Sequence, residues 1–196
     1  MQKNIWNNKN LIKVLTEGGV AVMPTDTLYG IVGKAEDKNV VEQIYKIRKR
    51  NPKKPFIILI GDMSELEKFS ISLSDQQKKE ILKYWSFNPT LDFQPDPTSI
   101  VLDCPDERFS YLHRGIKTLA FRVPFPQALR DLLLKTGPLI APSANTEKFP
   151  ASENIEDAKK YFGDKVDLYV DEGSIRSKAS KIIKLHKDGT ISILRE

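Results

Sequence analysis

The sequence predicts an α/β domain that ends in an antiparallel hairpin. Apolar residues at helical spacing alternate along the chain with short apolar runs that are typical of buried strands. Near the C-terminus, two strand-like runs flank Asp188-Gly189, a pair that favours the tight turn of a hairpin. Helices that alternate with buried strands are expected to pack against one sheet.

The first helix and the first strand follow from the N-terminal apolar pattern. The helix covers the apolar residues within 11–15 and ends at Gly18-Gly19, because glycine permits a left-handed cap. The apolar run 20–23 is expected to be a strand that stops at Pro24, since proline cannot donate to the ladder.

The second helix is the best-marked element in the first half of the chain. Asn39 is expected to cap it with Glu42 as the capping partner, and apolar residues up to position 47 share one face. The helix ends near Arg50, because Pro52 disfavours helical geometry at the residue before it.

The remaining elements continue the alternation. In order, we expect a strand over 56–60, a helix opened by Ser74 and Gln77, strands over 99–102 and 118–123, a helix ending at Gly137, a short strand over 139–141, a helix near 153–162, a strand over 166–170, and the closing hairpin of 181–186 with 190–195. Residues 86–97 are the least regular stretch, and loops of this length are often insertions or lids. We expect a single domain over 1–196 with this stretch as an insert or a lid.

Composition excludes several classes of protein. With Cys104 as the only cysteine and His113 and His186 as the only histidines, a disulfide framework and a multi-cysteine or histidine-rich metal site are both disfavoured. The first 20 residues contain no long apolar run, so we expect a cytoplasmic protein without a membrane partner. A net charge of +5 permits a nucleic-acid or polyphosphate partner without requiring one.

A cluster of five cations over residues 48–54 lies between the second helix and the strand at 56–60. Like charges repel one another, so the cluster is either a solvated turn or a site that faces an anion. Composition alone does not separate these two readings.

Polar residues also follow three of the predicted strands. Thr25-Asp26-Thr27 follows the first strand, Arg122 lies within the strand at 118–123, and Ser143 and Asn145 follow the strand at 139–141. Each group also has a purely structural interpretation. Thr25-Asp26-Thr27 could form a turn that bonds its own backbone, Arg122 could pair with an internal carboxylate, and Ser143 and Asn145 could cap a loop. Ligands of α/β sheets gather where strands end, so these residues could instead meet Arg48, Arg50 and Lys54 around a triphosphate. Mg²⁺ would then be held by the phosphates, with no protein side chain as a metal ligand.

Four segments, taken together and in this order, resemble the YrdC-like family, whose best-known members are the L-threonylcarbamoyladenylate synthases. They are GGVAVMPTDTLYG at 18–30, IYKIRKRNPKKP at 44–55, LAFRVP at 119–124 and APSAN at 141–145. The resemblance implies a twisted, open mixed sheet with flanking helices and a positively charged concave face.

The resemblance also implies a set of site residues. The catalytic set is Arg48 and Arg50 of the Lys-x-Arg element with Ser143 and Asn145 of the Ser-x-Asn element, and the substrate- or nucleotide-binding set is Thr25, Thr27, Tyr29, Lys54, Thr98, Arg122, Ser180 and Arg195. Among these, Thr27 resembles a threonine contact and Arg122 the arginine that reads the substrate carboxylate. The implied substrates are ATP with Mg²⁺, L-threonine and bicarbonate.

The implied reaction forms threonylcarbamoyl-AMP and pyrophosphate by nucleotidyl transfer, for the threonylcarbamoyl modification of tRNA by a separate transferase system. Arginine replaces the first lysine of Lys-x-Arg, and residues 86–96 split the family's segment between Trp85 and Pro97. Two alternatives stay open: a YciO-type paralogue with weak or different nucleotide activity, and a non-catalytic protein that binds tRNA or double-stranded RNA.

Overall fold

The strands form a single mixed sheet in the order β7-β1-β2-β6-β3-β5-β4-β8-β9. The computed structural model describes residues 4–86 and 96–196. The strands are β1 (Ala21–Pro24), β2 (Tyr29–Lys34), β3 (Ile57–Leu59), β4 (Thr98–Asp103), β5 (Thr118–Arg122), β6 (Leu139–Ile140), β7 (Leu168–Tyr169), β8 (Lys181–Leu185) and β9 (Ile191–Arg195). The α-helices are α1 (Lys9–Thr16), α2 (Lys38–Arg48), α3 (Asp75–Trp85), α4 (Ser110–His113), α5 (Gln127–Thr136) and α6 (Ile155–Phe162), and the 3₁₀ turns are η1 (Ile5–Asn7), η2 (Met63–Phe69), η3 (Glu107–Phe109) and η4 (Gly163–Lys165).

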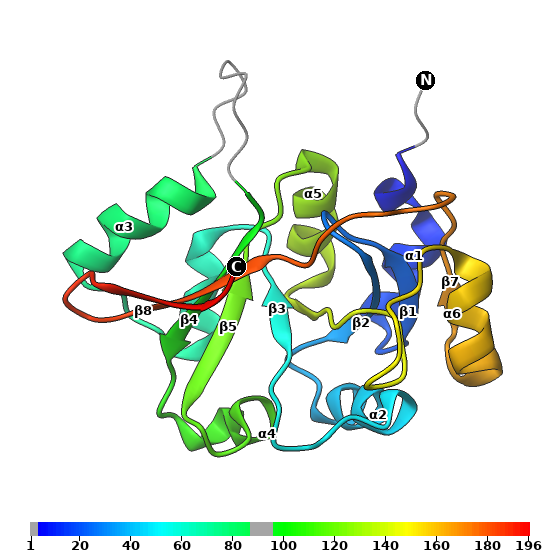
Figure 1. Ribbon diagram of the computed structural model, residues 1–196, viewed down its shortest axis with the longest axis horizontal. Helices are drawn as coiled ribbons and strands as arrows, with labels where there is room; N and C mark the ends of the chain where they lie inside the picture. The colour runs from blue at the N-terminus through cyan, green and yellow to red at the C-terminus, as the bar shows by residue number, and fades with distance from the viewer. Residues whose placement is uncertain (1–3, 87–95) are drawn as a thin grey trace.

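The predicted α/β class, with a mixed open sheet and flanking helices, is confirmed. The pairs β1–β7, β3–β5 and β4–β8 are parallel, and the other neighbouring pairs are antiparallel. In Figure 1 the strands run from β8 at the left through β5 and β3 to β7 at the right. No helix among the described residues combines the length and the apolar character that a membrane span requires.

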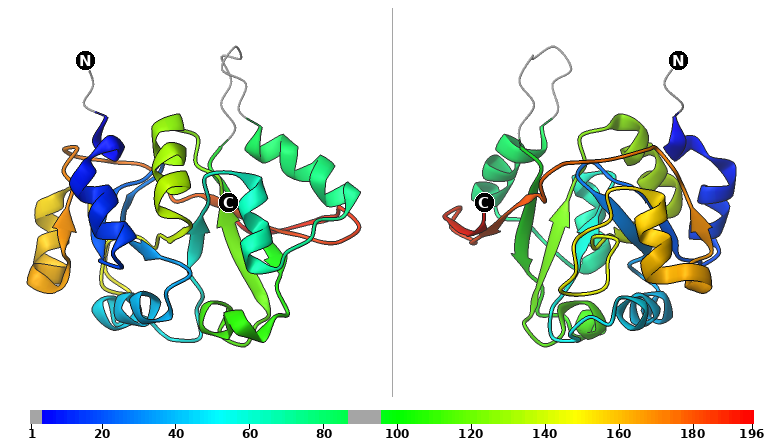
Figure 2. Two further views of the ribbon diagram at one scale, coloured as in Figure 1. Left: turned by 180° about the vertical axis from the view of Figure 1, so that it is seen from behind. Right: turned by 45° about the vertical axis from the view of Figure 1, so that its right-hand side comes forward.

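The two faces of the sheet carry two separate cores. Ala21 and Met23 of β1 pack with α1 and α5 on one face, and α1 and α5 lie side by side in the left view of Figure 2. The alternate residue Val22 points to the other face, where it joins the larger core that includes α2, α3 and α6. Alternation along the strands thus explains why the strand sequences are apolar on both faces.

Helix ends follow the local sequence, with one correction. Ser74 and Gln77 form the predicted capping box of α3, and Gly18 takes the left-handed φ of +84° after α1. The predicted cap of α2 at Asn39 is wrong: the Asp37 side chain accepts the amides of Asn39 and Val40, and the helix begins two residues earlier. The helix ends at Arg48, because Lys49 takes a left-handed φ of +50°.

Strand β2 was not predicted, because Gly30 and Gly33 interrupt its apolar pattern. The close approach of α2 explains the second glycine. A Cβ at Gly33 would lie 2.4 Å from Cγ1 of Val40, closer than two carbon atoms can approach. Helix α2 therefore packs directly on the β2 backbone, which fixes where its C-terminal end lies.

The face of the sheet that carries the α1–α5 core remains open at one end. Leu59 of β3 and Leu139 of β6 pack in that core. Ile57 lies two residues before Leu59, Ala141 lies two residues after Leu139, and both line a cavity. Residues 171–180 cross this end from β7 to β8, as the orange segment in Figure 1 and in the right view of Figure 2 shows.

Candidate active site

A partly open cavity of about 190 Å³ lies at this end of the sheet. The turn after β1, the end of α2, the start of β3, the end of β5, the loop after β6 and the end of β9 all contribute to it. Of the described residues that line it, none is acidic and four are arginines: Arg48, Arg50, Arg122 and Arg195. The other predicted residues in the lining are Thr25, Thr27, Tyr29, Ser143 and Ser180.

Arg48 lies buried at the end of α2 and is held by neutral groups alone. It is 2% exposed. Its Nε donates to the Asn145 carbonyl at 3.0 Å, and its Nη2 donates to Asn145 Oδ1 at 2.8 Å and to Ser143 Oγ at 3.3 Å. Its Nη1 is buried without a hydrogen-bond partner among the described residues. Burial and the charge of Arg50 lower the pKa of Arg48 to about 10.

Asn145 lies behind Arg48 and outside the cavity lining. Its Nδ2 donates to the carbonyls of Thr146 and Phe149, so its Oδ1 is directed towards Arg48 and the Ser143 hydroxyl. The Ser-x-Asn element therefore orients Arg48 in this structure, and Ser143 alone of the pair reaches the cavity.

Arg50 and Lys54 have different environments although they are four residues apart. Arg50 donates to the carbonyls of Lys54 and Pro55 at 3.1 and 3.2 Å, and burial lowers its pKa. Lys54 does not line the cavity, and its ammonium pairs with Glu147 at 2.9 Å. The Asn51 amide also donates to Glu147, and with Lys54 it lowers the pKa of this carboxyl to about 2.

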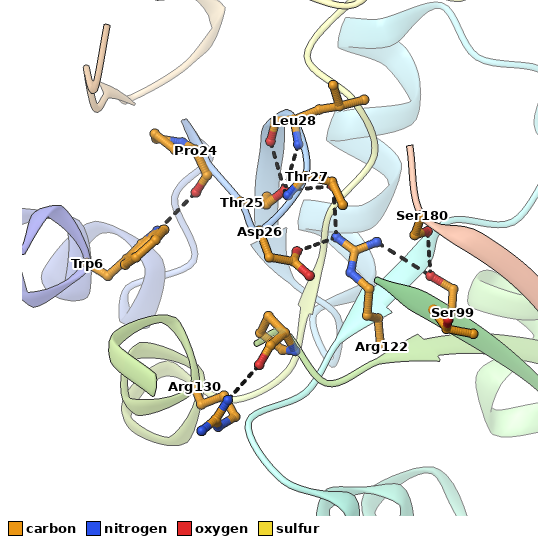
Figure 3. Close-up of polar contacts among 12 residues, drawn as sticks. Trp6, Pro24, Thr25, Asp26, Thr27, Leu28, Ser99, Arg122, Arg130 and Ser180 are labelled. Atoms are coloured by element: carbon orange, nitrogen blue, oxygen red, sulfur yellow. Dashed lines mark hydrogen bonds and ion pairs between the residues drawn. The ribbon is translucent and has the colours of Figure 1, made fainter. Parts of the chain in front are cut away.

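Arg122 has an internal carboxylate partner. Its Nη2 donates to Asp26 Oδ1 at 2.8 Å, in a pair whose side chains are 4% and 3% exposed. The same Nη2 reaches Thr27 Oγ1 at 3.3 Å, Nη1 reaches Ser99 Oγ at 3.4 Å, and Nε has no partner among the described residues. Figure 3 shows the guanidinium between Asp26, Thr27 and Ser99. Asp26 thus neutralises Arg122 without using all of its donors.

Arg195 closes the cavity from β9. Its guanidinium donates twice to the Ser180 carbonyl, at 3.0 and 2.7 Å, and the Ser180 hydroxyl contacts Ser99 Oγ at 2.9 Å. Burial and the charge of Arg122 lower the pKa of Arg195. Ser99 links this part of the lining to Arg122.

Three further predicted residues have mainly structural contacts. The Thr25 hydroxyl bonds the Leu28 carbonyl within its own turn, as the structural alternative predicted. The Tyr29 hydroxyl donates to the Gly173 carbonyl and so ties the crossing segment to β2. Thr98 lies outside the lining and donates to the Asp96 carbonyl. The predicted loop 86–97 falls mostly outside the described residues.

The balance of charge around the cavity favours an anionic ligand. Among the described residues, Arg48, Arg50 and Arg195 form no ion pair with a carboxylate, in contrast to Arg122 and Lys54. Arg48 is buried, Arg50 is half-buried and Arg195 is exposed. A buried guanidinium such as that of Arg48 is unfavourable unless something neutralises it. The described residues contain no group of three or more acidic, histidine or cysteine side chains suited to a metal ion.

The chain is similar to known proteins in sequence and in fold. The family model Sua5/YciO/YrdC, described as "Telomere recombination", matches residues 13–196. The chain belongs to the Sua5/YciO/YrdC family. A family relative from Methanocaldococcus jannaschii, named provisionally as a threonylcarbamoyl-AMP synthase, is 31% identical over 184 residues, which are 93% of this chain and 82% of the relative.

Solved structures of the Sua5/YciO/YrdC family share the fold. E. coli YciO is similar with a TM-score of 0.76 and 28% identity, covering 100% of this chain and 90% of YciO. P. abyssi Sua5 complexed with L-threonine is similar with a TM-score of 0.79 and 24% identity, covering 97% of this chain and 54% of Sua5. This chain therefore spans about half of that Sua5 protein.

The sequence analysis did not select Asp26, Ser99, Phe56 or Glu147. Asp26 lay in the polar turn after β1, but nothing in the sequence connected it to Arg122, which is 96 residues away. Phe56 read as the start of a buried strand, and its ring lines the cavity beside the arginines. Glu147 had no local signal, because its partner Lys54 is 93 residues away.

Proposed function

We propose that this protein is a threonylcarbamoyl-AMP synthase that uses L-threonine, bicarbonate and ATP. The observation that carries the proposal is a cavity whose described lining contains no acidic residue and has three arginines without an ion pair to a described carboxylate, in a chain of the Sua5/YciO/YrdC family. The name of the M. jannaschii relative and the threonine bound to P. abyssi Sua5 support the choice of substrates.

The amino-acid substrate fits the Arg122 side of the cavity. The Nε of Arg122 has no hydrogen-bond partner within the described part of the chain, and its Nη1 bond to Ser99 is long at 3.4 Å, so the guanidinium has donors left to bind a second carboxylate beside Asp26. The Thr27 hydroxyl lies within reach of the same group. At about 190 Å³ the cavity is smaller than the roughly 300–1,000 Å³ of pockets that enclose larger ligands, so a nucleotide would extend onto the open face.

The triphosphate would meet the three cavity arginines that form no ion pair with a described carboxylate, Arg48 and Arg50 near the end of α2 and Arg195 at the end of β9. These cations would neutralise the phosphate oxygens and the leaving pyrophosphate. Mg²⁺ would arrive with ATP and be held by phosphate oxygens.

The chemistry then needs positioning and charge stabilisation. The threonine nitrogen attacks CO₂ or bicarbonate to give a carbamate, and bicarbonate releases one water in this step. A carbamate oxygen attacks the α-phosphorus, and the bond to the β-phosphate oxygen breaks to release pyrophosphate. Neither His113 nor His186 lines the cavity, so the proposal involves no histidine-activated nucleophile. A tRNA threonylcarbamoyl transferase system would consume the product.

Pyrophosphate release from Mg·ATP and bicarbonate, with and without L-threonine, tests the proposal. We expect release that depends on threonine, together with a product of the mass of threonylcarbamoyl-AMP. Release that is independent of threonine, or no release with an intact fold, would refute the proposal. Arg50→Ala is expected to abolish turnover and preserve the fold, and an active variant would show that Arg50 is not in the site.

A further inference from the structure

Two stacked aromatic rings lie directly beside the arginines of the site. Tyr45 of α2 and Phe56 stack with ring centroids 4.1 Å apart and an interplanar angle of 29°. The Cζ atoms of Arg50 and Arg48 lie 5.1 and 6.0 Å from the Phe56 ring centroid. On the side of Tyr45, the Cζ of Arg114 lies 3.9 Å from the ring centroid. We call Tyr45 and Phe56 the aromatic stack.

The aromatic stack also shares a backbone acceptor with Arg50. The Tyr45 hydroxyl and the Arg50 Nε both donate to the Lys54 carbonyl, at 2.9 and 3.1 Å. This carbonyl joins the residues before β3 to the end of α2. The position of the Arg50 guanidinium therefore depends on Tyr45 through one shared oxygen and on Phe56 through its ring.

The described groups that contact the Arg50 guanidinium are electrically neutral, and Glu147 acts on it only through space. Its partners are two carbonyls and an aromatic ring, and the face of a ring attracts a cation through its quadrupole without cancelling the charge. A carboxylate in the same place would fix the guanidinium equally well, but the ligand would have to compete with it. The nearby Glu147 is instead occupied by Lys54 and the Asn51 amide.

We propose that the aromatic stack positions Arg50, and through Phe56 also Arg48, for the anionic ligand while leaving their charge available. Tyr45 and Phe56 are positioning residues in this sense, and Arg114 and its partner Glu42, at 2.8 Å, hold the far side of the stack. The inference rests on the proposed function only in taking the ligand to be the polyphosphate of that site.

Direct binding of inorganic pyrophosphate tests the inference without requiring turnover. Phe56→Leu removes the ring and keeps an apolar side chain, and we expect pyrophosphate affinity to fall roughly ten-fold. Phe56→Tyr keeps the ring and is expected to bind within about two-fold of the wild type. Tyr45→Phe removes only the bond to the Lys54 carbonyl and is expected to lose affinity in the same direction by a smaller factor.

A matched control is available at Phe109, whose ring also carries an arginine: the Cζ of Arg108 lies 5.6 Å from its centroid. Phe109 lies outside the cavity lining, so Phe109→Leu should bind pyrophosphate like the wild type. In turnover, Phe56→Leu should raise KM for ATP and leave KM for threonine unchanged, because Arg122 is held independently.

Three results would overturn the inference: wild-type pyrophosphate affinity in Phe56→Leu, an equal loss in Phe109→Leu, or no loss in Tyr45→Phe. If Phe56→Leu does not fold, Tyr45→Phe alone decides. Pyrophosphate binding by a wild-type protein without threonine-dependent turnover would contradict the proposed function and leave the inference intact.

Discussion

Replacing Arg48 with methionine is expected to separate the stability of the empty protein from its capacity to bind an anion. Arg48 is 2% exposed, and burial with the charge of Arg50 lowers its pKa from 12.5 to about 10. A pKa change of this size corresponds to about 3 kcal/mol. At pH 7 the guanidinium is charged in the folded and the unfolded chain, so this amount destabilises the empty fold.

The substitution also removes favourable hydrogen bonds. Asn145 Oδ1 keeps the Ser143 hydroxyl as a donor at 2.7 Å, so the Asn145 carbonyl is the main acceptor that loses a partner. An unsatisfied buried acceptor costs about 1–3 kcal/mol. Removing the buried charge should stabilise the fold by about 3 kcal/mol, and losing the hydrogen bond should cost about 1–3 kcal/mol of that gain. The free energy of unfolding of Arg48→Met should therefore lie between that of the wild type and about 2 kcal/mol above it.

Urea unfolding at pH 7, with and without inorganic pyrophosphate, measures both effects. Pyrophosphate at 100 times its Kd should stabilise the wild type by about 2.7 kcal/mol and should not stabilise Arg48→Met. Lys49→Met is the matched control, because Lys49 is an exposed neighbouring cation. If Arg48→Met loses more than about 3 kcal/mol without ligand, or keeps its response to pyrophosphate, Arg48 is a structural residue and the reasoning fails.

Three further predictions concern the neighbours of the site. Lys54→Met should raise the pKa of the Glu147 carboxyl from about 2, which a carboxyl NMR titration measures. It should also lower turnover, because Glu147 is then free to approach Arg50. Turnover should return in the double variant Lys54→Met/Glu147→Gln, and a persistent loss would mean that Lys54 touches the substrate. Asp26→Asn breaks the buried ion pair with Arg122 and should lower the free energy of unfolding in urea by about 3–5 kcal/mol. An unchanged unfolding midpoint would contradict the presence of this ion pair. Gly33→Ala places a Cβ 2.4 Å from α2 and should destabilise the fold by about 1–3 kcal/mol, with a neutral effect counting against the close packing of α2 on β2.

The sequence predicted those elements whose start or turn is determined by a few adjacent residues. The capping box at Ser74 and the hairpin turn at Asp188-Gly189 depend on a few adjacent residues, and both are present. Strand β2 was missed because its glycines serve the packing of α2, a tertiary requirement that lowers the local strand signal. The cap of α2 was predicted at Asn39 rather than Asp37 although its signal is local, because both residue types are good N-caps and they lie two positions apart.

The candidate site shows the same division between local and long-range information. Arg48, Arg50, Arg122 and Ser143 line one cavity, as expected from their positions near the ends of strands or of a helix at one end of the sheet. The sequence could not assign the carboxylate partners, since each pair joins segments more than 90 residues apart. It therefore grouped Lys54 with the arginines, although Lys54 is already paired.

The five cations of the basic run at 48–54 thus differ in the groups that surround them. Lys49 and Lys53 are exposed, and Lys54 pairs with Glu147. Arg48 is buried against a carbonyl, an amide and a hydroxyl, and Arg50 is half-buried against two carbonyls and a ring. If the run were only a solvated turn, its arginines would remain in water, where their charge costs little. Burying the Arg48 guanidinium without a carboxylate destabilises the empty protein, and an anionic ligand is the group that removes this cost. The unfavourable burial of Arg48, with the half-buried Arg50 beside it, is therefore the strongest physical argument that the cavity binds an anion.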